Sequence, residues 1–304
     1  LKLDSELFSA SQNAESEGRE GYYYLFSKEE FEEELLNKIT RFEFDSDSFH
    51  LPAQPLSNSI IETLNEIRAS KIAPEIDHKV IISWNALTIE GLFYYYLASG
   101  EKAILKQAKA SLNAALSDSK SLRHVAGDPS SNAVLEDYAF LAKTALTAYQ
   151  ITGERYYLEA AIELADEAID RFEMSESPLF ANSPKNLSSG VPRIINSSDG
   201  VLPNPNAILS STLYDLSHIT GVESYKKRHE AMVMAIQPWV SESMGFFPSW
   251  ANNLLHNQHP FYEVVVMGEE AKSFAEELLI KQFANTLTLH SSEESEESPL
   301  FKNR

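Results

Sequence analysis

Three segments of the chain share one pattern of apolar and polar positions. In each, a nearly all-apolar stretch is followed by a short polar turn with glycine, and then by a stretch that is apolar on one side only. The segments begin near Trp84, Glu136 and Asn204 and turn at Gly100, Gly153 and Gly221. A helix that is apolar all round is buried all round, whereas a single apolar face is typical of a helix on a surface. The pattern therefore predicts three helical hairpins, each with a buried inner helix and a half-exposed outer helix.

The second segment shows this pattern most clearly. Between Tyr138 and Ile151 the only formal charge is Lys143, and small or apolar residues occupy every face of the predicted helix. Gly153 suits the left-handed position at which many helices end. Residues 154–172 then carry apolar side chains at helical spacing with acidic residues between them, as expected of an outer helix.

Alternating inner and outer helices predict an all-α fold of the α/α-toroid class, a closed (α/α)6 barrel-like ring of hairpins. An open solenoid would repeat at about 34 residues with two similar helices, and these units are longer, unequally spaced and built from dissimilar helices. Short strands are expected near residues 22–26 and 264–268. No strong linker divides the chain, so we predict one domain over residues 1–304, with an acidic flexible tail at 290–304.

Composition narrows the range of functions. The chain has 304 residues, of which 43% are hydrophobic, no cysteine, and a formal net charge of −20. The lack of cysteine excludes disulfides, thiolate catalysis and cysteine-ligated zinc, and no uncharged apolar stretch is long enough to cross a membrane. The acidic charge disfavours binding to nucleic acids and to anionic membranes, and it suits a neutral or cationic small ligand. We expect a soluble, cytoplasmic protein.

If the hairpins are equivalent, their inner helices run in the same direction and begin at one end of the ring. Helix N-termini offer unpaired N–H groups and a positive dipole end, which favour hydroxyl-rich or anionic ligands. The first polar cluster at this end is Asp77, His78 and Lys79, followed by Trp84 and Asn85. A carboxylate, an imidazole and an ammonium suit acid/base chemistry, and a tryptophan face suits a sugar ring. The alternative is a solvated turn beside a core tryptophan.

The second cluster is Glu136, Asp137 and Tyr138. An acid at a helix start caps N–H groups and complements the helix dipole, so a purely structural role is the alternative here. Two adjacent acids exceed what one cap needs. The candidate catalytic residues are therefore Asp77, His78, Glu136 and Asp137, and the first candidates for substrate binding are Lys79, Trp84, Asn85 and Tyr138.

The third cluster is Asn204-Pro205-Asn206, a good capping sequence whose two asparagines are further candidates for substrate binding. Arg193 lies in the long irregular stretch 175–203 and is a candidate ligand clamp over the mouth. The histidines show no metal-ligand spacing, and His124 is not chosen as an acid or base. No phosphate-binding glycine motif occurs. We therefore expect no metal and no cofactor.

Several of these motifs resemble one family. Residues 135–141 (LEDYAFL) and 77–87 (DHKVIISWNAL) are similar to its Leu-Glu-Asp-Tyr-Ala-Phe signature and to its Asp-Asp-Lys…Trp-Asn-Gly-Leu stretch, and residues 203–207 to a Pro-Ser-x-Asn-Ser motif. The family comprises thioredoxin-domain-containing proteins of the spermatogenesis-associated type, and the likeness covers most of the chain in order. His78 and Ala86 depart from the pattern, where the family has an acid and a glycine.

This resemblance implies an (α/α)6 toroid of the six-hairpin glycosidase type, similar to N-acylglucosamine 2-epimerase. It also implies a thioredoxin-like domain before Leu1 as a partner in the full-length protein, with residues 1–26 as the junction that follows it.

Two functions fit these residues. The first is a carbohydrate-active enzyme, with epimerase- or isomerase-like acid/base chemistry, or with glycoside hydrolysis by two suitably spaced carboxylates. The second is a noncatalytic carbohydrate-binding or scaffold module that accompanies a thioredoxin-like domain. Both take a small carbohydrate-like ligand. A deep polar cavity with two free carboxylates favours the enzyme, and acids locked in helix caps favour the binding module.

Overall fold

The computed structural model describes residues 6–31, 33–43, 48–51, 55–117, 121–187, 192–281, 283–293 and 298–302. They form two compact units, one made of Ser9–Lys79 and the other of Val80 onward together with the segment that ends at Phe8. The sequence pattern predicts a single domain. The difference arises because the N-terminal quarter of the chain closes a small core of its own, made of Phe26, Phe31, Ile39, Phe49 and Leu64.

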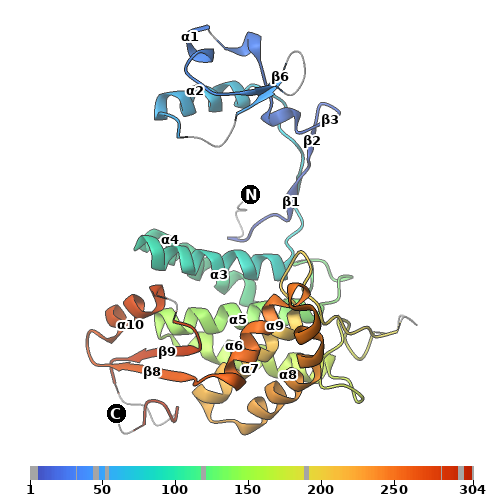
Figure 1. Ribbon diagram of the computed structural model, residues 1–304, viewed down its shortest axis with the longest axis vertical. Coiled ribbons are helices and arrows are strands. Elements are labelled where there is room, and N and C mark those ends of the chain that lie inside the picture. Colours follow the sequence, from blue (N-terminus) through green and yellow to red (C-terminus); the bar gives the residue numbers. More distant parts are fainter. Residues whose placement is uncertain are drawn as a thin grey trace. The chain divides into compact units, whose positions relative to one another are not determined.

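The first unit is built from short antiparallel strands and two helices (Figure 1). The pairs are β1 (Ser11–Gln12) with β7 (Ile76–Asp77) and β2 (Glu15–Ser16) with β3 (Arg19–Glu20), and β6 (Ser48–His50) lies between β4 (Phe26–Ser27) and β5 (Phe42–Glu43). The helices are α1 (Glu33–Leu36) and α2 (Asn58–Ala69). The strand expected at 22–26 is instead a 3-10 turn at Tyr22–Tyr24 followed by β4.

The second unit contains the three predicted hairpins. They are α3 (Ile82–Ser99) with α4 (Lys102–Leu116), α5 (Leu135–Thr152) with α6 (Arg155–Phe172), and α7 (Pro205–Thr220) with α8 (Glu223–Ser243). Each inner helix ends at a glycine in the left-handed region, with φ of 71° at Gly100, 72° at Gly153 and 74° at Gly221. The predicted all-α, α/α-toroid class with a few short strands is confirmed, and the described residues hold three such hairpins.

The inner helices lie side by side and run in the same direction. Helix α5 lies between α3 and α7 and contacts both. Thr144 donates a hydrogen bond to the Ala86 carbonyl (3.0 Å) and Thr147 to the Glu90 carboxylate (2.9 Å), so residue numbers rise together along α3 and α5. Helix α5 is buried on all sides. In the described part of the chain α3 contacts one other inner helix, α5, and its Tyr95 is 51% exposed.

The C-terminal part of this unit covers two sides of the hairpins. Helix α9 (Pro248–Gln258) packs against α7 and α8. Strands β8 (Tyr262–Met267) and β9 (Thr286–Ser291) pair in parallel, and α10 (Ala271–Ile280), which joins them, contacts α3 and α5. The sequence predicts β8 but not β9, although the alternation in the β9 sequence TLTLHS is typical of a strand.

The predicted flexible tail is packed where the structure describes it. Leu300 and Phe301 are buried, and the Ser298 hydroxyl donates to the Ile219 carbonyl at the end of α7. Residues 294–297 and 303–304 lie outside the described residues. None of the helices in the described ranges combines the length and the apolar composition that crossing a bilayer requires.

Candidate functional site

The starts of α3 and α5 are joined by hydrogen bonds to the two adjacent acids. The Ser83 amide donates to Asp137 Oδ1 (3.1 Å) and the Ser83 hydroxyl to Glu136 Oε1 (2.9 Å). The expectation that inner helices begin at one end of the unit is therefore correct for these two. The residues held together there are those of the Leu-Glu-Asp-Tyr motif.

Asp137 is a fully buried helix cap. Its Oδ2 accepts from the Val134 amide (2.9 Å), just before the helix, and both of its oxygens contact His124 Nδ1, at 3.0 and 3.1 Å. The hydrogen bond that His124 makes to the Asp137 carboxylate raises the pKa of His124, against an opposing effect of burial. With 0% of its surface exposed, Asp137 can act on a ligand only through His124, whose side chain is 31% exposed.

The asparagines at the other helix starts bind backbone. Asn85 accepts from the Phe8 amide (2.8 Å) and donates to the Phe8 carbonyl (3.0 Å), and Asn206 makes the same pair with Phe180 (2.7 and 3.0 Å). Asn204 caps α7 by accepting from the Ala207 amide (3.2 Å). All three asparagines are buried. One device is thus used twice: an amide in the first turn of an inner helix clamps an extended segment.

The remaining candidates are dispersed. The Tyr138 ring is fully buried against Phe172, whereas Trp84 is 41% exposed. Arg193 donates to the carbonyls of Phe172, Glu173 and Ser183 at 2.9 to 3.1 Å, so it fastens its own loop to the end of α6.

Asp77, His78 and Lys79 belong to the first unit, whereas the other candidates belong to the second. Lys79 and Asp77 form a solvent-exposed ion pair of 3.0 Å, which lowers the pKa of Asp77. The pair is solvent-exposed, as the alternative from the sequence expects, but Asp77 ends strand β7 and Trp84, at 41% exposed, is not a core residue.

Among the described residues one group has the geometry to hold a metal ion. Ligand atoms of His124, Glu136 and Asp137 lie within 4.8 Å of one another. The sequence predicts no metal, and the oxygens of Asp137 already accept from two backbone amides and face His124 Nδ1. Hydrogen bonds within the protein therefore account for this group.

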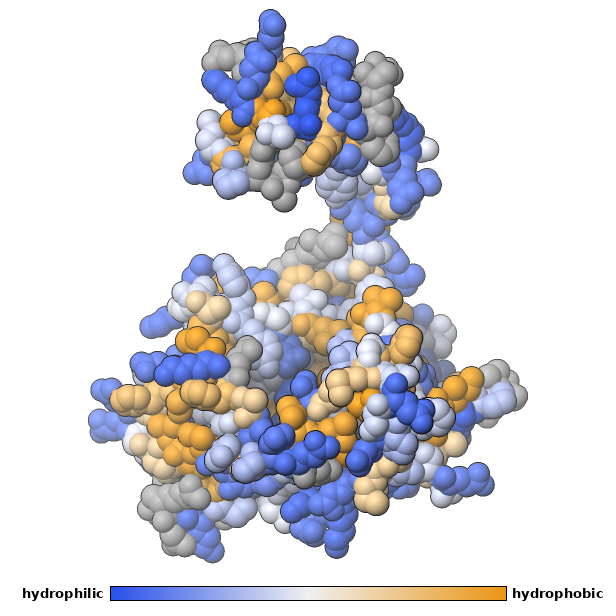
Figure 2. Space-filling view, in the orientation of Figure 1, coloured by the Kyte–Doolittle hydropathy of each residue, from blue (hydrophilic) through white to orange (hydrophobic). Residues whose placement is uncertain are grey.

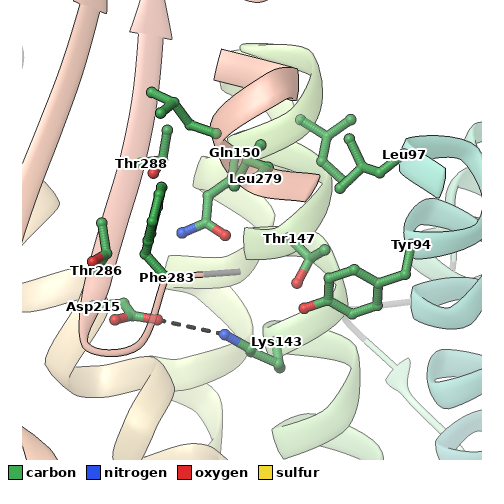
Figure 3. A pocket seen from close by; sticks show the side chains of 12 residues that line it. Tyr94, Leu97, Lys143, Thr147, Gln150, Asp215, Leu279, Phe283, Thr286 and Thr288 are labelled. Carbon is green, nitrogen blue, oxygen red and sulfur yellow. Dashed lines mark hydrogen bonds and ion pairs between the residues drawn. The ribbon is translucent and has the colours of Figure 1, made fainter. Parts of the chain in front are cut away.

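A cavity opens farther along the inner helices, away from these motifs. This central cavity, of about 410 Å³, is lined by the later halves of α3, α5 and α7, by α10 and by β9 (Figure 3). Its polar residues are Lys143, Thr147, Gln150, Asp215, Thr286 and Thr288, and its aromatic ones are Tyr94 and Phe283. No residue predicted from the sequence as part of the site lines it.

The central cavity contains a buried ion pair. Lys143 Nζ lies 3.5 Å from Asp215 Oδ2, and the two side chains are 23% and 11% exposed. Burial raises the pKa of Asp215, although Lys143 opposes the shift. Burial lowers the pKa of Lys143, but Asp215, Tyr94 and Glu90 together outweigh it, so the net pKa is raised. Lys143 is thus held as a cation inside the second unit, called the helical unit below.

These residues share a sequence signal that lies outside the motifs. Beyond the first turn, each inner helix has a single formal charge: Glu90 in α3, Lys143 in α5 and Asp215 in α7. In the structure the three meet, because Thr147 links Glu90 to the cavity wall and Lys143 pairs with Asp215. Burying a charge costs free energy unless the charge is paired. A lone charge on an otherwise apolar helix therefore indicates where the cavity lies.

Next to Asp215, three histidine rings surround Tyr214. The ring centroids of His218, His229 and His256 lie 4.7, 4.6 and 4.4 Å from that of Tyr214. Burial lowers the pKa of His229 and of His256 to about 4 in each case. His218 Nδ1 contacts Glu263 at 2.6 Å. The neutral rings of His229 and His256 thus pack α8 and α9 against Tyr214 of α7.

Comparison with known proteins adds relatives for the chain. A scan against protein-family models finds no match. The chain is similar to spermatogenesis-associated protein 20. It is 25% identical to the human protein and 24% identical to the mouse protein over 237 residues, 70% of this chain in each case.

An uncharacterised protein of Caenorhabditis elegans is 28% identical over 180 residues, 55% of this chain. The matches cover 29% of the human and mouse relatives and 24% of the worm protein, so the chain spans less than a third of their length. The family resemblance of the motifs is supported to this extent, and the thioredoxin-like partner domain stays a prediction.

Two solved structures have a partly similar arrangement. A GH76 α-mannanase of Bacteroides thetaiotaomicron gives a TM-score of 0.45 at 19% identity, covering 56% of this chain and 46% of that one. A family 76 mannosidase of the same organism gives 0.42 at 16%, covering 52% and 44%. Scores below 0.5 do not establish a shared fold, so the assignment to the α/α-toroid class comes from the hairpins themselves.

Proposed function

We propose that the helical unit binds a neutral, hydroxyl-rich small molecule of mono- or disaccharide size in the central cavity, as a noncatalytic carbohydrate-binding module. The observation that carries this proposal is the Lys143–Asp215 pair, which lies in a cavity of about 410 Å³ lined by the three inner helices. Cavities of roughly 300–1,000 Å³ with a few convergent polar groups are typical of small-molecule sites.

The lining suits a ligand with many hydroxyl groups. Lys143 donates and Asp215 accepts. The Thr147 hydroxyl, which already donates to Glu90, can accept, and the Gln150 amide can do both. Gln150 has no hydrogen-bond partner among the described residues and points into the cavity (Figure 3). Because the cation and the anion are already paired, a ligand needs no net charge of its own. Tyr94 and Phe283 add aromatic surface of the kind that packs against sugar rings.

The contacts of Glu136 and Asp137, at the start of α5, favour a binding function over catalysis. Asp137 is fully buried and accepts from two amides, and Glu136 accepts from Ser83. In the central cavity Asp215 is paired with a cation. Two free carboxylates facing one cavity, as a glycosidase needs, do not occur among the described residues that line the central cavity.

A binding screen tests this proposal. Neutral mono- and disaccharides are compared with an amino sugar and a uronic acid by thermal shift, and hits are measured by calorimetry. We expect a neutral sugar to raise the melting temperature. Replacing Gln150 by Leu should weaken its binding about three- to tenfold, as for one or two lost hydrogen bonds, whereas Gln107→Leu on the outer helix α4 should leave it unchanged. If no neutral sugar stabilises the protein, the proposal is wrong.

A second candidate function is an acid/base enzyme of the epimerase type, because His124 is paired with Asp137 beside Glu136. In it, Asp137 orients the imidazole through Nδ1 and the exposed ring offers Nε2 to a substrate proton. The test is exchange of sugar C–H protons with deuterated solvent, followed by NMR. The enzyme requires exchange that His124→Gln abolishes and that Asp137→Asn slows, and wild-type protein that catalyses no exchange on any sugar it binds rules it out.

A further inference from the structure

A second cavity adjoins the central cavity and is lined almost entirely by apolar atoms. This apolar cavity, of about 330 Å³, is bounded by β8, the end of α10 and the start of β9. It shares Leu278, Phe283, Thr286 and Thr288 with the central cavity. The residues that line it alone are Tyr262, Val264 and Ala284. The two cavities are therefore neighbours that differ in chemistry, one with paired charges and amides and the other without a charged side chain.

Phe283 stands where the two cavities meet. Its side chain faces the cavity in Figure 3 and is nevertheless 56% exposed. Tyr262 beside it is 58% exposed, and Phe274 and Ile280 on α10 are 56% and 52% exposed. Figure 2 shows apolar side chains gathered over this part of the second unit. Exposed apolar surface of this kind, next to a polar pocket, is typical of ligand-binding grooves.

The pairing of the cavities constrains the ligand. A free sugar would fill the polar cavity and leave the aromatic surface in water. A ligand with an apolar group attached to the sugar would cover that surface as well, and burial of apolar area is favourable by roughly 25 cal/mol per Å². The ligand chemistry that satisfies both cavities is a hydroxyl-rich head joined to an apolar tail.

We propose that the ligand of this protein is an amphipathic glycoside, with its sugar in the central cavity and its apolar aglycone in the apolar cavity across Phe283. This proposal rests on the proposed function, because it assumes that the polar end of the ligand is a sugar. It goes further by naming the class: a glycolipid or an alkyl glycoside rather than a free sugar.

Calorimetry with matched alkyl glycosides tests the proposal. The full chain is titrated with methyl and octyl β-D-glucopyranoside and with the corresponding mannosides, all below their micelle concentrations. Each buried methylene is worth about 0.8 kcal/mol, or roughly fourfold in affinity. Partial burial of the chain should therefore make the octyl glycoside bind at least about tenfold more tightly than the methyl glycoside.

Two variants test whether the octyl chain binds in the apolar cavity. Ala284→Glu puts a charge into the apolar cavity and should remove most of the advantage of the octyl glycoside, whereas Ala98→Glu, at an exposed alanine of α3 that lines neither cavity, should keep it. The double variant Lys143→Met/Asp215→Leu should bind neither glycoside.

The outcomes separate the two proposals. If the methyl glycosides bind and the octyl chain adds nothing, the amphipathic ligand is wrong and sugar binding stands. If the octyl glycoside binds the double variant as well as it binds wild type, the surface takes alkyl chains without a sugar, and the amphipathic-glycoside proposal is overturned. If no glycoside binds, both proposals fail.

Discussion

The two ends of the inner helices of this protein use polar residues in opposite ways. At the N-terminal end, polar side chains are dense in the sequence, and Asn85, Asp137 and Asn206 accept hydrogen bonds from backbone amides. Along the later halves, polar residues are sparse, and Lys143, Thr147 and Asp215 face a cavity. The motif-rich end thus holds the hairpins together, and the motif-poor part has room for a ligand.

This difference teaches what a cluster of polar residues at a helix start signifies. The first turn of every helix has N–H groups without intrahelical partners, so selection for stability alone gathers Asp and Asn there. Inside an apolar helix no such demand exists, and a charge costs free energy unless it is paired. One charge in such a place is therefore a stronger sign of a site than three at a helix start.

The largest expected difference between the two regions is in how acid changes the free energy of unfolding. His229 is fully buried with its pKa lowered to about 4, so the folded protein binds fewer protons than the unfolded chain between about pH 4 and the usual histidine pKa of about 6.5. The stability it contributes is complete above about pH 6.5 and is lost as the pH falls to 4, by about 3 kcal/mol. The neighbouring His256 and His218 add to the lowering of the His229 pKa, and the hydrogen bond to the Ser210 carbonyl and the Asp215 carboxylate oppose it.

Urea unfolding between pH 4 and 8 measures this loss. His229→Gln should flatten the slope below pH 6.5. His124 has a raised pKa, so its contribution has the opposite sign: it is complete below about pH 6.5 and is lost as the pH rises through the raised value. An unchanged acid slope in His229→Gln would show that His229 is not buried as a neutral ring.

Removing Asp137 should cost nearly as much. Asp137→Ala leaves the Val134 and Ser83 amides and His124 without their acceptor in a buried place, which should lower the free energy of unfolding by about 3 kcal/mol. The adjacent Glu136→Ala removes one hydrogen bond from a partly exposed position and should cost about 1 kcal/mol or less. Urea melts at pH 7 compare the two. Equal costs would contradict the assignment of Asp137 as the cap and of Glu136 as a secondary contact.

We expect that the ion pair of the central cavity contributes little net stability, although breaking it is destabilising. Lys143→Met or Asp215→Leu alone leaves a buried charge unpaired and should destabilise by about 2 kcal/mol, whereas the double variant should lose less than either single one. A double-mutant cycle measures the coupling. The exposed pair Arg155–Glu159, whose side chains are 59% and 58% exposed, is the matched control, with an expected coupling of about 0.5 kcal/mol or less. Equal coupling in both pairs would mean that the cavity is open to water.

Much of the helical unit was predictable because its signals are periodic. The apolar stretches and the glycines at 100, 153 and 221 predict the hairpins and their ends within one or two residues. The first unit was not recognised as separate, because strands of two or three residues such as β4 and β6 are too short to show a period. Its core depends on Phe26, Phe31 and Phe49 meeting across the chain, which no local pattern reveals.

The candidate site was predictable only in part, for a different reason. A sequence shows that Asp137 and Asn206 lie at helix starts, but not whether their partner is a ligand or the backbone of Val134 or Phe180. The central cavity forms only where three inner helices meet the unit made of β8, α10 and β9, and no local sequence pattern shows that meeting. Lys143 was visible as a lone charge, yet its partner Asp215 lies 72 residues away.

The smallest effect compares two glycine caps with the same backbone. Gly100 and Gly153 have φ of 71° and 72°, so alanine should be strained at both by about 1 kcal/mol. A Cβ at Gly100 meets nothing within 4 Å, whereas one at Gly153 lies 2.9 Å from the His290 ring of β9. Gly153→Ala must also displace His290 from the Ile151 carbonyl (3.3 Å), which should add about 1 kcal/mol. Thermal melts of both variants give the difference. In a His290→Ala background the two alanines should cost the same; a persistent excess at Gly153 would mean that β9 is not what closes this end of α5.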